Sequence, residues 1–135
     1  MPINSRTKGA AFERLVVKKI NKCLEDNNQE DRVSRNFDQS WKSGLADIYF
    51  RDFCIECKRY GKSNTNMYKQ AWWEQVLKSA GDKFTPILIY KFDRKPIYAV
   101  IPAWLISTVP KNNQLTYMCP LEELCEHMEI ILNKK

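Results

Sequence analysis

Long hydrophobic segments are missing from this sequence. No apolar run approaches the roughly 18 residues that a membrane-spanning helix needs, and the stretch from Met1 to Lys8 has no hydrophobic signal segment. Internal repeats, linkers and low-complexity tracts are absent as well. We therefore expect a cytosolic, non-secreted protein whose 135 residues form one domain, residues 1–135.

Residues that commonly bind zinc are scarce. The chain has one histidine, His127, on the polar side of an expected C-terminal helix, and five cysteines without regular spacing. Cys54 and Cys57 are three positions apart, but residues at that spacing on a strand point to opposite faces. The sequence therefore disfavours a zinc site, and five dispersed cysteines in a cytosolic protein are expected to be reduced thiols.

What the chain does have is an excess of basic residues. It contains 22 Lys and Arg against 16 Asp and Glu, which gives a net charge of +6. Its 44% hydrophobic and 28% charged residues are ordinary for a soluble globular protein. A small basic domain is suited to a polyanionic partner such as nucleic acid.

Residues 46–58 predict a β-hairpin. Two apolar runs flank the polar pair Arg51-Asp52, as in two strands joined by a two-residue turn. This pair lacks the glycine that such turns favour, so a longer turn or a bulge remains an alternative. In the two-residue register, one face carries Ala46, Ile48, Phe50, Phe53, Ile55 and Cys57, and the other carries Tyr49, Cys54, Asp47, Glu56 and Lys58.

The hairpin would place two carboxylates, Asp47 and Glu56, directly opposite each other. Opposed carboxylates repel, and this costs stability unless a cation lies between them. Carboxylate oxygens are the ligands that Mg²⁺ prefers, and Lys58 follows on the same face. The pattern predicts a magnesium site, with a solvated outer face of the hairpin as the alternative.

A helix is expected from about Lys8 to Glu25. Its apolar residues at helical spacing are Phe12, Val16, Ile20, Cys23 and Leu24. Glu13 falls inside this apolar arc, where a carboxylate is costly unless it is paired or metal-bound. Glu13 is therefore a third candidate ligand, or else an edge residue whose side chain reaches solvent.

These motifs resemble the PD-(D/E)XK nuclease superfamily: Asp47, an eight-residue gap, then Glu56-Cys57-Lys58. Within it, Lys8-Gly9 followed by Glu13-Arg14 and an apolar stripe is most similar to archaeal-type Holliday-junction resolvases. The likeness runs from about Lys8 to Phe92, and Ala46 stands where the superfamily name has Pro.

The resemblance and the element order both imply an α/β, restriction-endonuclease-like single domain, a central mixed β-sheet flanked by helices. The expected function is a metal-dependent DNA endonuclease that resolves four-way junctions in recombination and repair, at work on the nucleoid, with Mg²⁺ as cofactor and Mn²⁺ as a substitute. Symmetric nicking of a junction favours a homodimer. The alternatives are a restriction or repair nuclease acting on duplex or flap DNA, and a non-catalytic nucleic-acid-binding module.

The expected roles at the site are as follows. Asp47 and Glu56 hold the metal, with the backbone carbonyl of Cys57 as an extra oxygen ligand and Glu13 completing the shell. Lys58 orients the attacking water or neutralises charge in the transition state. The resemblance places a Gln on the second helix near the catalytic Lys, which makes Gln75 a further catalytic candidate, with an exposed helix Gln as the alternative.

Candidate DNA contacts surround this site. A short strand at Val33–Phe37 and a loop over residues 38–44 are expected to lead the chain to Asp47. The candidates for binding the DNA backbone are Lys8, Arg14, Arg35, Lys42, Ser43, Arg59 and Lys62.

The remaining chain predicts further helices and strands. A helix over residues 67–80, capped by Thr65 or Asn66 and ended by Gly81, is expected to bury Trp72 and Trp73. The other expected elements are strands 86–92 and 97–101, a helical turn at 104–106, a polar loop 107–118 and a helix 120–132. Residues 97–106 are a candidate dimer surface, with the core as the alternative.

Overall fold

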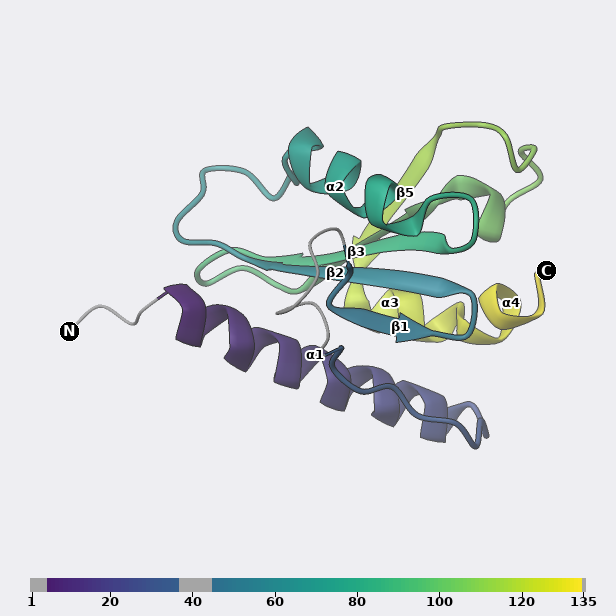
Figure 1. Ribbon diagram of the computed structural model, residues 1–135, viewed down its shortest axis with the longest axis horizontal. Helices are drawn as coiled ribbons and strands as arrows, with labels where there is room; N and C mark the ends of the chain where they lie inside the picture. Colours follow the sequence, from purple (N-terminus) through teal and green to yellow (C-terminus); the bar gives the residue numbers. More distant parts are fainter. Residues whose placement is uncertain (1–4, 37–44, 135) are drawn as a thin grey trace.

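The computed structural model describes residues 5–36 and 45–134. Its elements are α1 (Ser5–Asp26), β1 (Ile48–Phe50), β2 (Phe53–Arg59), α2 (Gln70–Ala80), β3 (Thr85–Lys91), β4 (Tyr98–Pro102), η2 (Ala103–Leu105), β5 (Thr116–Pro120), α3 (Leu121–Glu126) and α4 (Met128–Asn133). The strands form one five-stranded sheet in the order β1-β2-β3-β4-β5 (Figure 1). β2 and β3 are parallel and the other neighbours antiparallel. The predicted mixed sheet is confirmed.

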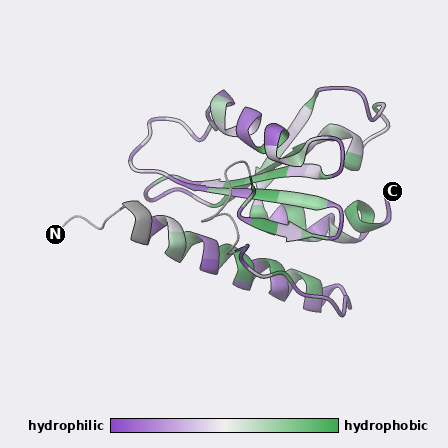
Figure 2. Ribbon diagram, viewed as in Figure 1, coloured by the Kyte–Doolittle hydropathy of each residue, from purple (hydrophilic) through white to green (hydrophobic). Residues whose placement is uncertain are grey.

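Helices cover both faces of the sheet. On one face, α1 packs with α3 and α4 over Ile48, Ile55 and Ile89. On the other face, α2 covers Cys54, Leu88 and other buried residues. Figure 1 shows α2 and α1 on opposite sides of the strands, and Figure 2 shows hydrophobic residues concentrated on the strands between them. The fold is restriction-endonuclease-like, as predicted.

The apolar stripe of α1 is confirmed. All five predicted residues are at most 5% exposed: Phe12, Val16, Ile20, Cys23 and Leu24. The helix begins at Ser5, three residues before the predicted start at about Lys8. Ser5-Arg6-Thr7 contains no proline or glycine to stop the helix from extending over it.

The hairpin is confirmed with the predicted register. Phe50 pairs with Phe53 and Ile48 with Ile55, across the two-residue turn Arg51-Asp52. Arg51 takes the left-handed conformation, φ 53°, that glycine usually supplies in such turns. One detail is wrong: Ala46 packs in the cluster beneath α2, because β1 begins at Ile48 and the alternation of faces does not extend to it.

Two local predictions around the hairpin are corrected. The expected strand Val33–Phe37 is reduced to one bridge, Arg35 to Ile48, while Phe37 and the predicted loop 38–44 lie outside the described residues. The second helix begins at Gln70, without a side-chain cap. Thr65 instead uses its hydroxyl oxygen to accept from the Met67 backbone N–H at 3.1 Å, which closes a local turn before the helix.

The C-terminal third differs more from the prediction. The expected polar loop 107–118 ends in a strand, β5, which pairs with β4. The expected helix 120–132 is interrupted at His127 and forms α3 and α4. Of the candidate dimer surface, Ile97, Ile101 and Leu105 are buried in the chain's own core. That stretch is therefore interior, because β4 lies between β3 and β5.

One cysteine prediction is wrong. Cys23 of α1 and Cys125 of α3 are bonded as a disulfide, while Cys54, Cys57 and Cys119 are free. The two bonded residues approach each other because α1 and α3 pack on the same face of the sheet, which places their Cα atoms 5.5 Å apart. In the described part of the chain, no helix combines the length and the apolar composition needed to cross a membrane.

Candidate active site

The structure brings Asp47 and Glu56 together in the interior. Asp47 immediately precedes β1, and Glu56 lies in the middle of β2. The backbone N–H of Asp47 donates to Glu56 Oε1 at 3.1 Å, and the backbone N–H of Cys57 donates to Asp47 Oδ2 at 2.7 Å. The two acidic residues are only 6% and 2% exposed. They are the sole buried charged residues in the described part of the chain.

Burial and mutual repulsion make the pair electrostatically costly. Burial, and after it the negative charge of Asp47, raises the pKa of Glu56 to about 8, while nearby Lys58 acts in the opposite direction. A cation between the carboxylates would remove both penalties. Their oxygens suit a hard divalent ion such as Mg²⁺. The donor set therefore fits the predicted metal.

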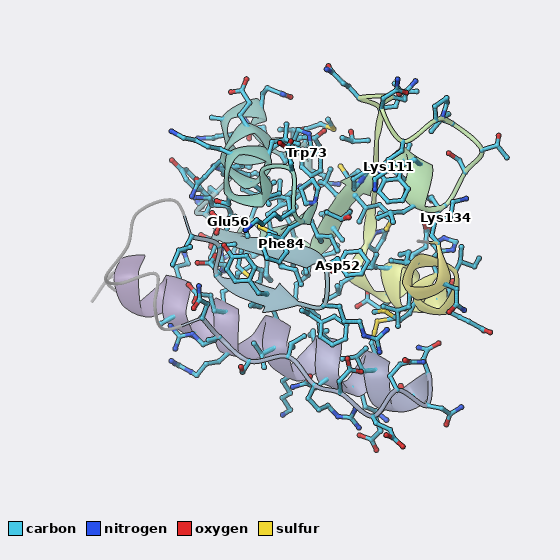
Figure 3. All side chains as sticks on the ribbon, turned by 45° about the vertical axis from the view of Figure 1, so that its right-hand side comes forward. Asp52, Glu56, Trp73, Phe84, Lys111 and Lys134 are labelled. Carbon is cyan, nitrogen blue, oxygen red and sulfur yellow. A yellow bond between two sulfur atoms is a disulfide. The ribbon has the colours of Figure 1, made fainter. Side chains whose placement is uncertain are left out.

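Gln75 of α2 also reaches the pair. Its side-chain Nε2 donates to Glu56 Oε2 at 2.5 Å, so both carboxylate oxygens of Glu56 accept hydrogen bonds. Figure 3 shows Glu56 on β2 beneath α2. Gln75 is exposed on its helix, as the alternative expected, yet it is hydrogen-bonded to Glu56. A catalytic role for Gln75 stays a prediction.

Glu13 lies on the other side of the site, on α1. Its Oε1 accepts a hydrogen bond from Arg35 Nε at 3.1 Å, and its side chain is 16% exposed. Burial, and after it the charge of Asp47, raises the pKa of Glu13, against the hydrogen bond from Arg35. Within the described ranges, no three His, Cys, Asp or Glu side chains are grouped to hold one ion. Direct ligation by Glu13 stays a prediction.

The segment entering the site is fixed by a residue that the sequence did not single out. The backbone N–H of Asn36 donates to the Asp47 carbonyl at 2.7 Å, and its side chain donates to the Ala46 carbonyl at 3.1 Å. The Ala46 N–H in turn donates to the Tyr49 hydroxyl at 3.1 Å. These bonds hold Asp47 in place before β1 begins. The sequence places Asn36 in the expected strand Val33–Phe37, and no local signal indicates that its side chain would contact Ala46.

A model of a protein family matches nearly the whole chain. The family is described as "Phage putative PDDEXK endonuclease", and the match covers residues 4–132. The chain belongs to this family. Comparisons with curated proteins and with solved structures found no match. Membership in the PDDEXK endonuclease family confirms the superfamily of the resemblance and indicates a nuclease with DNA as its substrate.

The letters of the PDDEXK name correspond to residues already located in the site. Asp47 supplies the first acidic position, and Glu56-Cys57-Lys58 supplies the acidic residue and lysine two positions later. Lys58 is half-buried and lies on the same face of β2 as Glu56, since residues two apart on a strand share a face. The structure therefore places Asp47, Glu56 and Lys58 of this PDDEXK endonuclease family member together at one hairpin, and their catalytic roles stay a prediction.

The candidate DNA contacts are spread over several elements. Lys8 and Arg59 both reach Asp93, at 3.0 and 2.8 Å. Arg14 and Lys62 are exposed. Lys42 and Ser43 lie outside the described residues. The structure thus gathers Lys8 and Arg59, and it adds Asp93, which sequence reasoning treated only as part of a turn.

Glu13 provides a direct test of the site's third carboxylate. We expect Glu13→Gln to lower the turnover number about 10–100-fold, as removal of residues that support metal ligands commonly does. The reason is that Gln keeps the shape but loses the negative charge beside Asp47. Initial cleavage rates of labelled DNA with Mg²⁺ measure the effect, and Mn²⁺ should partly restore it.

The matched control is Glu25→Gln, the same change at an exposed position of the same helix. Its turnover should equal that of the wild type. Equal turnover in the Glu13 and Glu25 variants would show that Glu13 is structural only.

Proposed function

We propose that the chain is a Mg²⁺-dependent endodeoxyribonuclease that hydrolyses phosphodiester bonds in DNA. The observation that carries the proposal is the buried Asp47–Glu56 pair, hydrogen-bonded to the backbone of its own hairpin and followed on the same strand face by Lys58. In a chain of a PDDEXK endonuclease family, this arrangement supports catalysis rather than structure, because it destabilises the fold unless a cation is bound.

Each residue would have a separate task. Asp47 and Glu56 would hold Mg²⁺, with the Cys57 carbonyl and Glu13 as further candidate ligands. When bound, the metal supplies charge that polarises the phosphoryl group and activates water. Lys58 would place a positive charge beside the reacting phosphate, and Gln75 would keep Glu56 in one orientation through its 2.5 Å hydrogen bond.

For the preferred substrate we propose a four-way DNA junction. The support is the order of Lys8-Gly9, Glu13-Arg14 and the later acidic residues, which is similar to archaeal-type resolvases. Resolving a junction needs two symmetric nicks, and a two-fold dimer would fix the spacing of two identical centres. Shape rather than base contacts would select the junction.

A second candidate is a nuclease that cuts ordinary duplex or flap DNA. It is favoured by the description of the matching family, which names an endonuclease and no junction. A non-catalytic binding module is disfavoured, because a chain without metal chemistry would gain stability by losing its buried carboxylates.

The deciding experiment is a cleavage panel of junction, flap, single-stranded and linear duplex DNA. We expect cleavage with Mg²⁺ or Mn²⁺ and none with Ca²⁺ or EDTA, because Ca²⁺ accepts looser coordination. We expect junctions to be cut at least tenfold faster than linear duplex of identical sequence, by a protein that sediments as a dimer at micromolar concentration. Equal cutting by a monomer would support the second candidate, and full activity in EDTA would refute both.

A further inference from the structure

Basic side chains converge where β2 and β3 end. Lys8 Nζ and Arg59 Nη1 both contact Asp93 Oδ1, at 3.0 and 2.8 Å. Lys91 is the strand neighbour of Arg59 in the parallel pairing, and Arg94 follows in the turn to β4. We call Lys8, Arg59, Lys91 and Arg94, with Asp93 among them, the basic cluster.

The backbone holds these residues in fixed positions. The Tyr60 N–H donates to the Lys91 carbonyl at 3.0 Å, and the Asp93 N–H donates to the Gly61 carbonyl at 3.1 Å. The segment after β2 is therefore bonded to the β3–β4 turn. Figure 1 shows this turn, the segment after β2 and the start of α1 together at one end of the molecule.

The charges in the cluster do not balance. Lys8 and Arg59 contact the Asp93 carboxylate, and Lys91 and Arg94 are close to Asp93 in the chain, so the cluster's four cations and one anion carry a net charge of about +3 at neutral pH. Lys8 and Arg59 lower the pKa of Asp93 by hydrogen bonding. Burial, and after it the neighbouring Arg59, lowers the pKa of Lys91. Binding of a further anion would stabilise such an excess of positive charge. At Asp47 and Glu56 the excess charge is negative, and binding of a cation would stabilise it.

We propose that the basic cluster binds backbone phosphates of DNA next to the position that is cut. Arg59 ends β2 three residues after Glu56, about 10 Å along the strand. Although Arg59 and Lys58 point to opposite faces of β2, DNA bound at Glu56 would reach the cluster at the end of the strand. The β3–β4 turn, with Lys91 and Arg94, then becomes a DNA-binding element in addition to the residues named from the sequence. This inference rests on the proposed nuclease function.

The test compares two double variants that each remove two positive charges. Lys91→Ala/Arg94→Ala changes the cluster. Lys78→Ala/Lys83→Ala is the control and changes two exposed residues that precede β3. The seven residues of β3 extend about 20 Å, and this length separates the control positions from the cluster at the other end of the strand. Fluorescence anisotropy measures binding of labelled duplex DNA in EDTA over a series of salt concentrations, so that no cleavage occurs.

We expect the cluster variant to bind at least tenfold more weakly, and its plot of log affinity against log salt to be shallower by about 0.9 for each lost phosphate contact. The control should match the wild type in both its affinity for DNA and the salt dependence of that affinity. A second variant, Arg94→Ala/Lys95→Ala, changes only residues of the β3–β4 turn. Far-UV circular dichroism and thermal melting verify that each variant is folded.

The inference would be overturned if Lys91→Ala/Arg94→Ala and Arg94→Ala/Lys95→Ala both bound DNA as tightly as the control variant. If the wild type still cuts DNA with Mg²⁺ in that case, the proposed function stands without the cluster. Wild-type protein that neither binds nor cuts DNA would refute the proposed function itself, so the two failures are distinguishable.

Discussion

Asp47→Asn is expected to lower Mg²⁺-dependent cleavage by ~10³-fold or more, because the variant loses half of the metal-binding charge. Asn preserves the shape, and its amide oxygen can still accept the Cys57 N–H that now bonds Asp47 Oδ2 at 2.7 Å. The variant should therefore fold like the wild type but lose its cleavage activity. Single-turnover rates on labelled DNA, with enzyme in excess, measure the loss.

The matched control is Asp52→Asn, in the turn of the same hairpin. Figure 3 shows Asp52 at the turn and Glu56 further along the hairpin, away from Asp52, and Asp52 is exposed. This variant should cut at the wild-type rate. Asp47→Asn should also bind DNA as well as or better than the wild type, because a negative charge near phosphate is gone. Cleavage by Asp47→Asn at a near-wild-type rate would exclude Asp47 from the metal site.

Glu56→Gln is expected to have two opposite effects: loss of cleavage, and a higher free energy of unfolding for the metal-free protein. The pKa of Glu56 is about 8 in the folded chain against an ordinary value of 4.5. As the pH rises between these values, the unfolded chain releases the proton and the folded chain keeps it, so wild-type stability falls. Removing this penalty should raise the free energy of unfolding of the variant by several kcal/mol at pH 8.

Urea unfolding in EDTA at pH 5 and pH 8 measures this effect. The wild type should lose more stability between the two pH values than Glu56→Gln does, and Mg²⁺ at pH 8 should restore much of the wild-type loss by binding the folded state. Glu126→Gln, an exposed change on α3, should follow the wild-type profile. Parallel pH profiles for wild type and Glu56→Gln would contradict the buried-charge interpretation.

The hairpin could be predicted from the sequence because its signals are local. Alternating apolar residues and the polar Arg51-Asp52 pair set the register, and the register alone placed Asp47 beside Glu56. The helical phase of α1 likewise placed Glu13 toward the sheet, where the charge of Asp47 now affects its pKa. In both cases neighbouring residues determine the geometry.

Features that depend on distant contacts were missed. Lys8 and Asp93 are 85 positions apart, and only the packing of α1 beside the β3–β4 turn brings them together. β5 is a strand because β4 offers it a free edge, although Thr116–Pro120 follows a polar loop. Gln75 was named only because of the family resemblance; its helical phase predicted an exposed residue, and the crossover through α2 brings it to Glu56. Local patterns do not encode such tertiary contacts.

The two-residue turn between β1 and β2 also bears on how the chain folds. Closing this hairpin orders only a short loop, whereas the parallel pairing of β2 with β3 must wait for the crossover through α2. Asp47 and Glu56 therefore meet at low entropic cost, and they repel each other as soon as the hairpin closes. A divalent cation that relieves this repulsion would assist folding from its early steps, long before it serves in cleavage.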